Sequence, residues 1–209
     1  EVQQRYRCAF TKEPLELAEH RPYRDYITWT QGQDSKVAQA YWRGVLEGYE
    51  GASHLCVDQA PSDLHVPVDQ FDGQVLTVSQ EKTAALKEFG KLHAVTLNTL
   101  VQGAWALMLS AYTGQEDAVF GSVVSGRSVP MKGVEEIIGL FVNLLPTRVQ
   151  VLPDQDLVEW LQEFQKSQVE QRAFEHIGLA DVKAWSDIPA SKVMFETVVV
   201  FQNWTGDLT

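Results

Sequence analysis

Apolar residues recur three or four positions apart in four parts of the chain, which is the spacing of one face of an α-helix. These parts run from Ser35 to Tyr49, from Ser79 to Phe89, from Leu97 to Tyr112 and from Asp156 to Arg172. A short polar side chain at each start can accept hydrogen bonds from the first free backbone amides. The residues in this position are Asp34 or Ser35, Ser79, Thr96 and Asp156. We therefore predict four helices.

The predicted helix from Leu97 to Tyr112 is apolar on nearly every face. Such a helix is normally buried. We therefore expect Trp105 and Met108 to pack in the core and the helix to close at Gly114.

Four further segments have the apolar, β-prone composition of strands. They run from Gln74 to Val78, from Ala118 to Val124, from Leu140 to Val151 and from Phe195 to Trp204. The order strand, helix, helix, strand in the first half indicates a fold of the α/β (α+β) class, in which helices cover a sheet.

A Ser-Gly-Arg turn at Ser125, Gly126 and Arg127 separates two of these strands. Two extended apolar segments joined by a glycine turn with a lone arginine are typical of a loop beside a binding cleft. The turn also has the glycine spacing of a phosphate-binding loop, from Gly121 to Gly126. However, Arg127 replaces the lysine, and Pro130 follows where a helix should begin, so a nucleotide site is not predicted.

Asn143 interrupts the apolar run of the predicted strand from Leu140 to Val151. A buried amide without partners costs about 1 to 3 kcal/mol, so it must be hydrogen-bonded. It either ties the strand to a neighbouring backbone or faces a binding site. Arg148, which follows Pro146 near the strand end, is predicted to form a salt bridge.

The first 34 residues are mostly polar, and Pro14 and Pro22 prevent a long helix there. Three aromatic residues and an Arg-Asp pair lie between Tyr23 and Trp29. We interpret them as a patch that packs this segment onto the core, with direct substrate contact as the alternative. Residues 50–73 are predicted to be an irregular connector.

Composition narrows the classes of function. With 209 residues, 44% of them hydrophobic, the chain can form a core as one domain or as one lobe of a larger one. Its net charge of -11 argues against nucleic-acid and anionic-membrane partners.

Cys8 and Cys56 have no metal-ligand or disulfide spacing, so no metal is expected and a reducing cytoplasm fits best. No apolar run reaches transmembrane length, and the lack of an initial Met suggests a piece of a longer protein.

Four short patterns follow one another along the chain. They comprise Tyr23, Asp25, Tyr26 and Trp29; then Ser125, Gly126 and Arg127 with Gly139, Phe141, Asn143, Pro146 and Arg148; then Glu175, His176, Trp185 and Ser186; and the segment from Phe195 to Asn203. In this order they resemble the motifs of the condensation domains of non-ribosomal peptide synthetases. Val182 and Gly178 depart mildly from the third motif, where isoleucine and proline are common. His176 is expected to be a hydrogen-bonding group at a helix start.

The resemblance implies two lobes like chloramphenicol acetyltransferase, each with a mixed β-sheet flanked by helices, and a tunnel between them. Residues 1–209 would be the C-terminal lobe, and residues 1–34 would lead in from the N-terminal lobe. The implied partners are that lobe, donor and acceptor carrier proteins, and an adjacent adenylation domain. Phosphopantetheine arms of the carrier proteins would bring in the substrates, with no cofactor bound directly.

In this family an aminoacyl amine attacks an acyl or peptidyl thioester beside a His-His-x-x-x-Asp-Gly motif. The five histidines here are all isolated, and the resemblance places that motif before Glu1. We therefore expect no catalytic residue in the chain and no activity of the chain alone. Ser125, Gly126, Arg127 and Asn143 are the candidates for the tunnel wall.

Two alternatives to peptide-bond formation stay open. One is a relative on the same fold that catalyses epimerisation, heterocyclisation or free acyl transfer. The other is a non-catalytic module that docks carrier or tailoring proteins.

Overall fold

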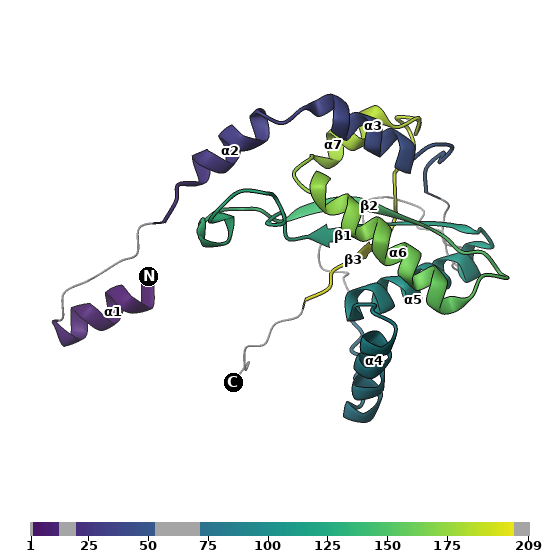
Figure 1. The fold of residues 1–209 in the computed structure, drawn as a ribbon, viewed down its shortest axis with the longest axis horizontal. Coiled ribbons are helices and arrows are strands. Elements are labelled where there is room, and N and C mark those ends of the chain that lie inside the picture. Colours follow the sequence, from purple (N-terminus) through teal and green to yellow (C-terminus); the bar gives the residue numbers. More distant parts are fainter. Residues whose placement is uncertain (1, 13–19, 53–71, 203–209) are drawn as a thin grey trace.

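The structure is a computed structural model that describes residues 2–12, 20–52 and 72–202 (Figure 1). Its α-helices are α1 (Val2–Thr11), α2 (Tyr23–Gln31), α3 (Ser35–Val45), α4 (Gln80–Leu92), α5 (Leu97–Thr113), α6 (Leu157–Gln171) and α7 (Leu179–Trp185). Two 3-10 turns, η1 (Val134–Glu136) and η2 (Arg172–Phe174), and three strands, β1 (Asp117–Val124), β2 (Asn143–Gln150) and β3 (Val198–Val199), complete the described chain.

The three strands form one sheet in the order β2-β1-β3. Strand β1 pairs antiparallel with β2, from Asp117 opposite Gln150 to Val124 opposite Asn143. It pairs parallel with β3, where Gly121 lies opposite Val198. The sheet is therefore mixed, as the family resemblance implies. Pro146 lacks a backbone N–H, and it lies on β2, an edge strand of the described sheet, where that loss is tolerated.

Helices cover both faces of this sheet (Figure 1). Because side chains alternate along a strand, Ala118 and Phe120 of β1 point to one face and Val119 points to the other. The first pair packs with residues of α5 and α6 such as Ala106 and Phe164. The other face packs against α3 and α7, and its largest buried side chain is Trp42, which is fully buried. The arrangement confirms the predicted class of helices on a sheet.

The predicted helix starts are present. The side chain of Asp34 accepts from the Lys36 amide, Ser79 from the Lys82 amide, Thr96 from the Thr99 amide, and Asp156 from the amides of Val158 and Glu159. Gly114 ends α5 in the left-handed conformation at φ 68°, which glycine adopts without a Cβ clash. These starts depend on local chemistry, which explains why the sequence predicts them well.

Strand predictions were less successful. The segment 74–78 is not a strand: it pairs with no described residue, and Val75 and Leu76 are 96% and 90% exposed. Strand β2 begins at Asn143 rather than Leu140, and β3 is confined to Val198–Val199, with residues 203 and 204 outside the described chain. β-prone side chains form a strand only where a partner strand supplies the hydrogen bonds.

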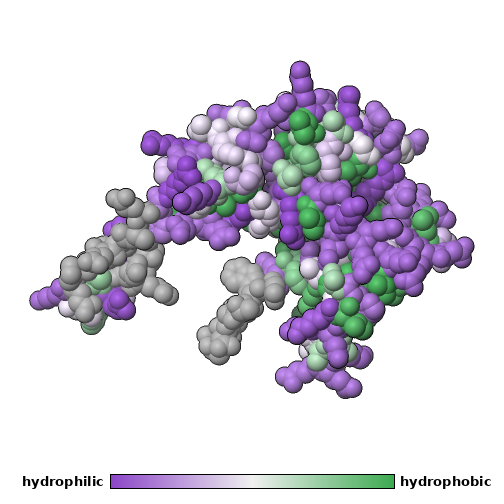
Figure 2. Space-filling model, viewed as in Figure 1, coloured by the Kyte–Doolittle hydropathy of each residue, from purple (hydrophilic) through white to green (hydrophobic). Residues whose placement is uncertain are grey.

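Helix α5 is less buried than its composition predicts. Trp105 packs partly against the core, and its indole N–H donates to the Thr197 hydroxyl at 3.1 Å. Met108 is 47% exposed, so its predicted core position is wrong. The sheet covers only one side of α5, and Figure 2 shows apolar side chains among hydrophilic ones in the region of α4 and α5. In the described part of the chain no single helix could span a membrane, although α4 and α5 pass that test as a pair bent by 103°.

Arg148 joins the sheet to helix α3. Its Nε and Nη2 donate to the Asp117 carboxylate at 2.6 to 3.0 Å, which is the predicted salt bridge. Its Nη1 also donates to the carbonyls of Val45 and Glu47 at 2.9 and 2.7 Å, at the end of α3. The single Arg148 guanidinium therefore donates hydrogen bonds to one carboxylate and to two carbonyls at the end of a helix.

We predict that Arg148→Ala lowers the free energy of unfolding of the intact protein by on the order of 2 kcal/mol, because it removes the donor to these acceptors. Urea unfolding measures the loss. The matched control is Arg24→Ala, since Arg24 is 87% exposed and only 4.0 Å from Asp25. That variant should lose less than about 0.5 kcal/mol. Equal losses in the two variants would contradict the prediction.

Candidate functional site

The Ser-Gly-Arg turn continues directly from the end of β1. Gly126 has φ 65°, and a Cβ on it would overlap the Phe141 carbonyl, so only glycine fits. The Arg127 guanidinium does not extend away from the protein. It donates to the carbonyls of Val134, Glu135 and Ile137 at 2.6, 3.3 and 3.1 Å and lies 4.1 Å from the centre of the Phe141 ring. Arg127 therefore holds the following loop in place through hydrogen bonds to its backbone. The assignment of Arg127 to a tunnel wall stays a prediction.

Helix α2 packs on the other side of the same loop. The Tyr26 ring lies 4.5 Å from the Phe141 ring, and Tyr23 meets Phe141 edge to face at 5.3 Å. The Tyr23 hydroxyl donates to the Leu140 carbonyl at 2.6 Å, and its ring covers Gly139 so closely that a Cβ there would overlap it. These contacts match the interpretation of the aromatic segment as a packing patch.

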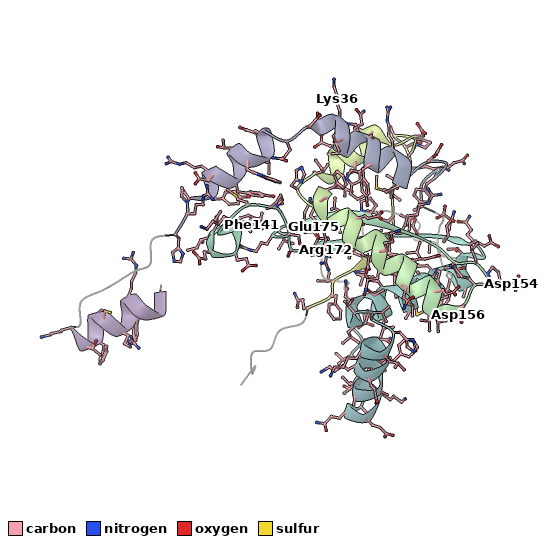
Figure 3. The ribbon with its side chains drawn as sticks, in the orientation of Figure 1. Lys36, Phe141, Asp154, Asp156, Arg172 and Glu175 are labelled. Carbon is pink, nitrogen blue, oxygen red and sulfur yellow. The ribbon has the colours of Figure 1, made fainter. Side chains whose placement is uncertain are left out.

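Arg21 and Asp25 also hold the start of α2 against the loop that follows the Ser-Gly-Arg turn. The Arg21 guanidinium pairs with the Asp25 carboxylate at 2.9 Å and donates to the Lys132 carbonyl, also at 2.9 Å. The first two sequence patterns, far apart in the chain, therefore meet around Phe141, which Figure 3 labels.

Asn143 begins β2 and binds the third pattern. Its Nδ2 donates to the carbonyls of Glu175 and Ile177 at 2.9 and 2.7 Å. Of the two interpretations from the sequence, these bonds correspond to the tie between a strand and a neighbouring backbone. They hold the chain on both sides of His176, and the proposed approach of Asn143 to a tunnel stays a prediction.

His176 lies between η2 and α7 rather than at a helix start. Neither ring nitrogen makes a hydrogen bond of standard geometry with a described residue. The ring meets Trp29 edge to face at 5.1 Å. Burial lowers the pKa of His176, which favours the neutral imidazole. The Ala173 backbone acts on the ring in the opposite direction and raises that pKa, so the hydrogen-bonding role stays a prediction. Trp185 closes α7, and its carbonyl accepts from Arg43 Nε at 3.1 Å.

Glu175 belongs to the third sequence pattern, but the sequence alone indicates no role for it. Its side chain is buried at 6% exposure, and Oε2 has no hydrogen-bond partner within the described chain. Burial raises the pKa of Glu175, while the Ser128 hydroxyl, Arg172 and the Gly126 backbone act in the opposite direction. One sequence feature could have identified Glu175 as a buried acid: it lies between the apolar residues Phe174 and Ile177, where a solvated side chain is not expected.

Glu175 lines a cavity of about 370 Å³ at the end of β1, between α5 and α6. Apart from Glu175 and Arg172, the polar residues of its walls are uncharged hydrogen-bonding groups, among them Gln102, Ser122, Ser125, Ser128, Gln168 and Gln171. Gln168 Nε2 donates to Gln102 Oε1 at 2.8 Å, and Gln102 Nε2 donates to the Ser122 hydroxyl at 3.0 Å. Of the predicted tunnel residues, Ser125 lines this cavity, whereas Arg127 lines a separate hollow formed by residues 127–136. Within the described residues no group of three or more His, Cys, Asp or Glu could hold a metal ion.

These features define an α/β protein with a mixed sheet between two helical layers and a polar cavity at one strand end. A sequence model of the family described as Condensation domain matches residues 1–208, and the chain belongs to that family.

Relatives agree with this assignment. The chain is 41% identical over 203 residues to one subunit of the linear gramicidin synthase of Brevibacillus parabrevis and 34% identical over 197 residues to bacitracin synthase 1 of Bacillus licheniformis. These matches cover 97% and 93% of this chain but only 4% of each synthase.

Solved structures share the fold. The first condensation domain of the CDA synthetase has a TM-score of 0.73 at 17% identity, and the match covers 97% of this chain and 44% of that one. The X-domain from teicoplanin biosynthesis also has a TM-score of 0.73, at 22% identity, over 93% of this chain and 45% of that one. The chain therefore spans less than half of each of these structures.

We predict that Asn143→Asp lowers the free energy of unfolding by about 1 to 3 kcal/mol, because a carboxylate replaces the donor to two carbonyls. Asn143→Ala removes the same donors without adding a charge, so its loss should be smaller. Urea unfolding of the intact domain measures both variants. An Asn143→Asp variant as stable as the parent would disprove the role of these two bonds.

We predict that His176 makes the domain less stable at mildly acidic pH. Because its pKa is lowered in the folded state, the unfolded chain binds the proton more readily, and stability falls as pH drops below the unfolded value of about 6.5. The His176→Phe variant keeps a ring against Trp29 and should show a smaller loss of melting temperature between about pH 7.5 and 5.5. Identical pH profiles of parent and variant would refute the prediction.

Proposed function

We propose that this chain is the C-terminal lobe of a condensation domain that forms a peptide bond between two carrier-bound thioesters. The observation that carries the proposal is membership of the family over residues 1–208 combined with a span of 44% of a solved condensation domain. The donor would be an acyl or peptidyl thioester, and the acceptor an aminoacyl thioester. The attacking group is the acceptor amine, and the products are the amide and the free thiol of the donor arm.

The N-terminal lobe would supply the catalytic histidine motif, since no two histidines are adjacent in this chain. A group that accepts or positions the proton of the amine must approach it to about 3 Å. In the described chain the half-buried His176 lies against Trp29 and is poorly placed for this task. This lobe would therefore contribute walls and substrate contacts rather than the base.

The remaining partners follow from the same chemistry. Donor and acceptor carrier proteins would insert phosphopantetheine arms, which carry amides and hydroxyl groups and suit walls of uncharged hydrogen-bonding side chains such as those at the end of β1. An adjacent adenylation domain would load the acceptor carrier protein. Ser125 and the Gly126 backbone would approach an arm, with Asn143 near the same region.

We predict dipeptidyl transfer by the synthetase that contains this chain and none by the isolated 209-residue chain. Purified donor and acceptor carrier proteins are loaded, and the peptidyl product is measured by mass spectrometry of the carrier protein. Transfer by the isolated chain would contradict the division of roles between lobes. If the whole protein binds both carriers without transfer, it is a docking module instead.

A further inference from the structure

Glu175 is an unusual residue for the place it occupies. A carboxylate at 6% exposure loses most of its hydration, which costs several kcal/mol unless a charge or hydrogen bonds compensate. Arg172 lines the same cavity, and Figure 3 labels both residues near the end of α6. No ion pair joins Arg172 to Glu175 within the described residues. The oxygen Oε2 is therefore an acceptor that no donor of the described chain reaches.

The backbone around Glu175 is held in place. Asn143 Nδ2 binds its carbonyl at 2.9 Å and the Ile177 carbonyl at 2.7 Å. The Gly126 backbone and the Ser128 hydroxyl favour the ionised form of Glu175 and so lower its pKa against the effect of burial. The terminal torsion of a glutamate is soft, so rotation of the carboxyl group can turn either oxygen toward the cavity. The backbone of Glu175 is thus anchored, and its carboxyl group can still meet a ligand.

The cavity lining selects the chemistry of that ligand. Glu175 is the one acidic residue among the described lining residues, so the site lacks the several oxygen charges that a divalent cation needs. Its carboxylate also disfavours an anion. A primary ammonium group donates three hydrogen bonds, which matches one carboxylate oxygen and the hydroxyls of Ser125 and Ser128. Its charge would compensate the acid, and the glutamines and threonines of the wall suit a neutral remainder. Arg172 is the other charged lining residue, but it is exposed, so solvent and salt screen its repulsion of an ammonium group.

Building on the proposed function, we propose that Glu175 binds the free amino group of the aminoacyl acceptor in the cavity at the end of β1. The carboxylate accepts a charge-assisted hydrogen bond from the ammonium form and so orients the acceptor before the proton is lost. Asn143 acts as a positioning residue because it fixes the backbone of Glu175. The donor thioester has no amine at its reacting end and makes no use of this contact.

The test uses the intact synthetase that contains this chain and two stable amide analogues of a substrate arm. One is glycyl pantetheine amide, and the other is acetyl pantetheine amide, which lacks only the amino group. Titration calorimetry should show that the parent protein binds the glycyl analogue about tenfold more tightly than the acetyl analogue. The Glu175→Gln variant should lose this preference through weaker binding of the glycyl analogue, with binding of the acetyl analogue unchanged.

The matched control is Glu170→Gln, which removes the same charge from an exposed position on α6 and should keep the preference. In the transfer assay, Glu175→Gln should raise KM for the loaded acceptor carrier protein about tenfold while kcat changes less than twofold. A merely structural role would lower kcat, or the folded fraction, and affect both analogues alike. The comparison of the two analogues on the parent protein needs no variant, so poor folding of Glu175→Gln does not remove the test.

Equal affinities of the parent protein for the two analogues would overturn the proposal, as would an unchanged preference in Glu175→Gln. The experiments distinguish failure of the amine site from failure of the proposed peptide-bond formation. Peptide transfer without amine preference would reject the amine site and leave the function in place. Amine preference without any transfer would support the site and reject peptide-bond formation.

Discussion

The packing of the Phe141 ring is the interaction on which the rest of the site depends. Tyr26 and Tyr23 of α2 pack against the ring, and the Arg127 guanidinium lies 4.1 Å from its centre. Such an arrangement combines apolar burial with a cation–π contact. Gly126 and Gly139 permit it because a Cβ at either position would meet Phe141 or Tyr23. Helix α2, the Ser-Gly-Arg turn and the loop before β2 therefore pack together around this ring.

This packing also determines where β2 begins. Phe141 is 3% exposed and points into the aromatic cluster, whereas its neighbours Leu140 and Val142 are 77% and 60% exposed. The chain reaches the sheet only at Asn143, opposite Val124. Asn143 is then placed to bind the backbone on both sides of His176. The buried Phe141 ring packs against helix α2, and Asn143, two residues later, binds the carbonyl of Glu175 in the wall of the polar cavity.

The sequence predicts the features that depend on neighbouring residues along the chain. Helix caps such as Asp34 and Asp156 were predicted because a side chain and the amides it binds are close in sequence. The predicted strand at residues 74–78 is absent, because a strand needs a partner distant in the sequence, which local composition does not reveal. The role of Arg127 could not be predicted either, since its acceptors belong to a loop with little regular structure. The same limit hid Glu175, whose significance comes from burial beside residues of β1, α5 and α6.

Several arginines of this acidic chain make the same kind of interaction, a hydrogen bond to backbone carbonyls. Arg21, Arg127 and Arg148 each donate to backbone carbonyls in loops or at helix ends. The flat guanidinium has five N–H groups, so one side chain can serve several acceptors in fixed directions, which a lysine ammonium does less well. Glu175 shows the opposite arrangement, because Arg172 is near it without forming an ion pair. Were stability the sole requirement at that position, a neutral glutamine would satisfy the same neighbours without the cost of burying a charge. The Oε2 atom of Glu175, which no donor of the described chain reaches, is therefore better explained by a cation that arrives with a substrate than by the packing of the protein itself.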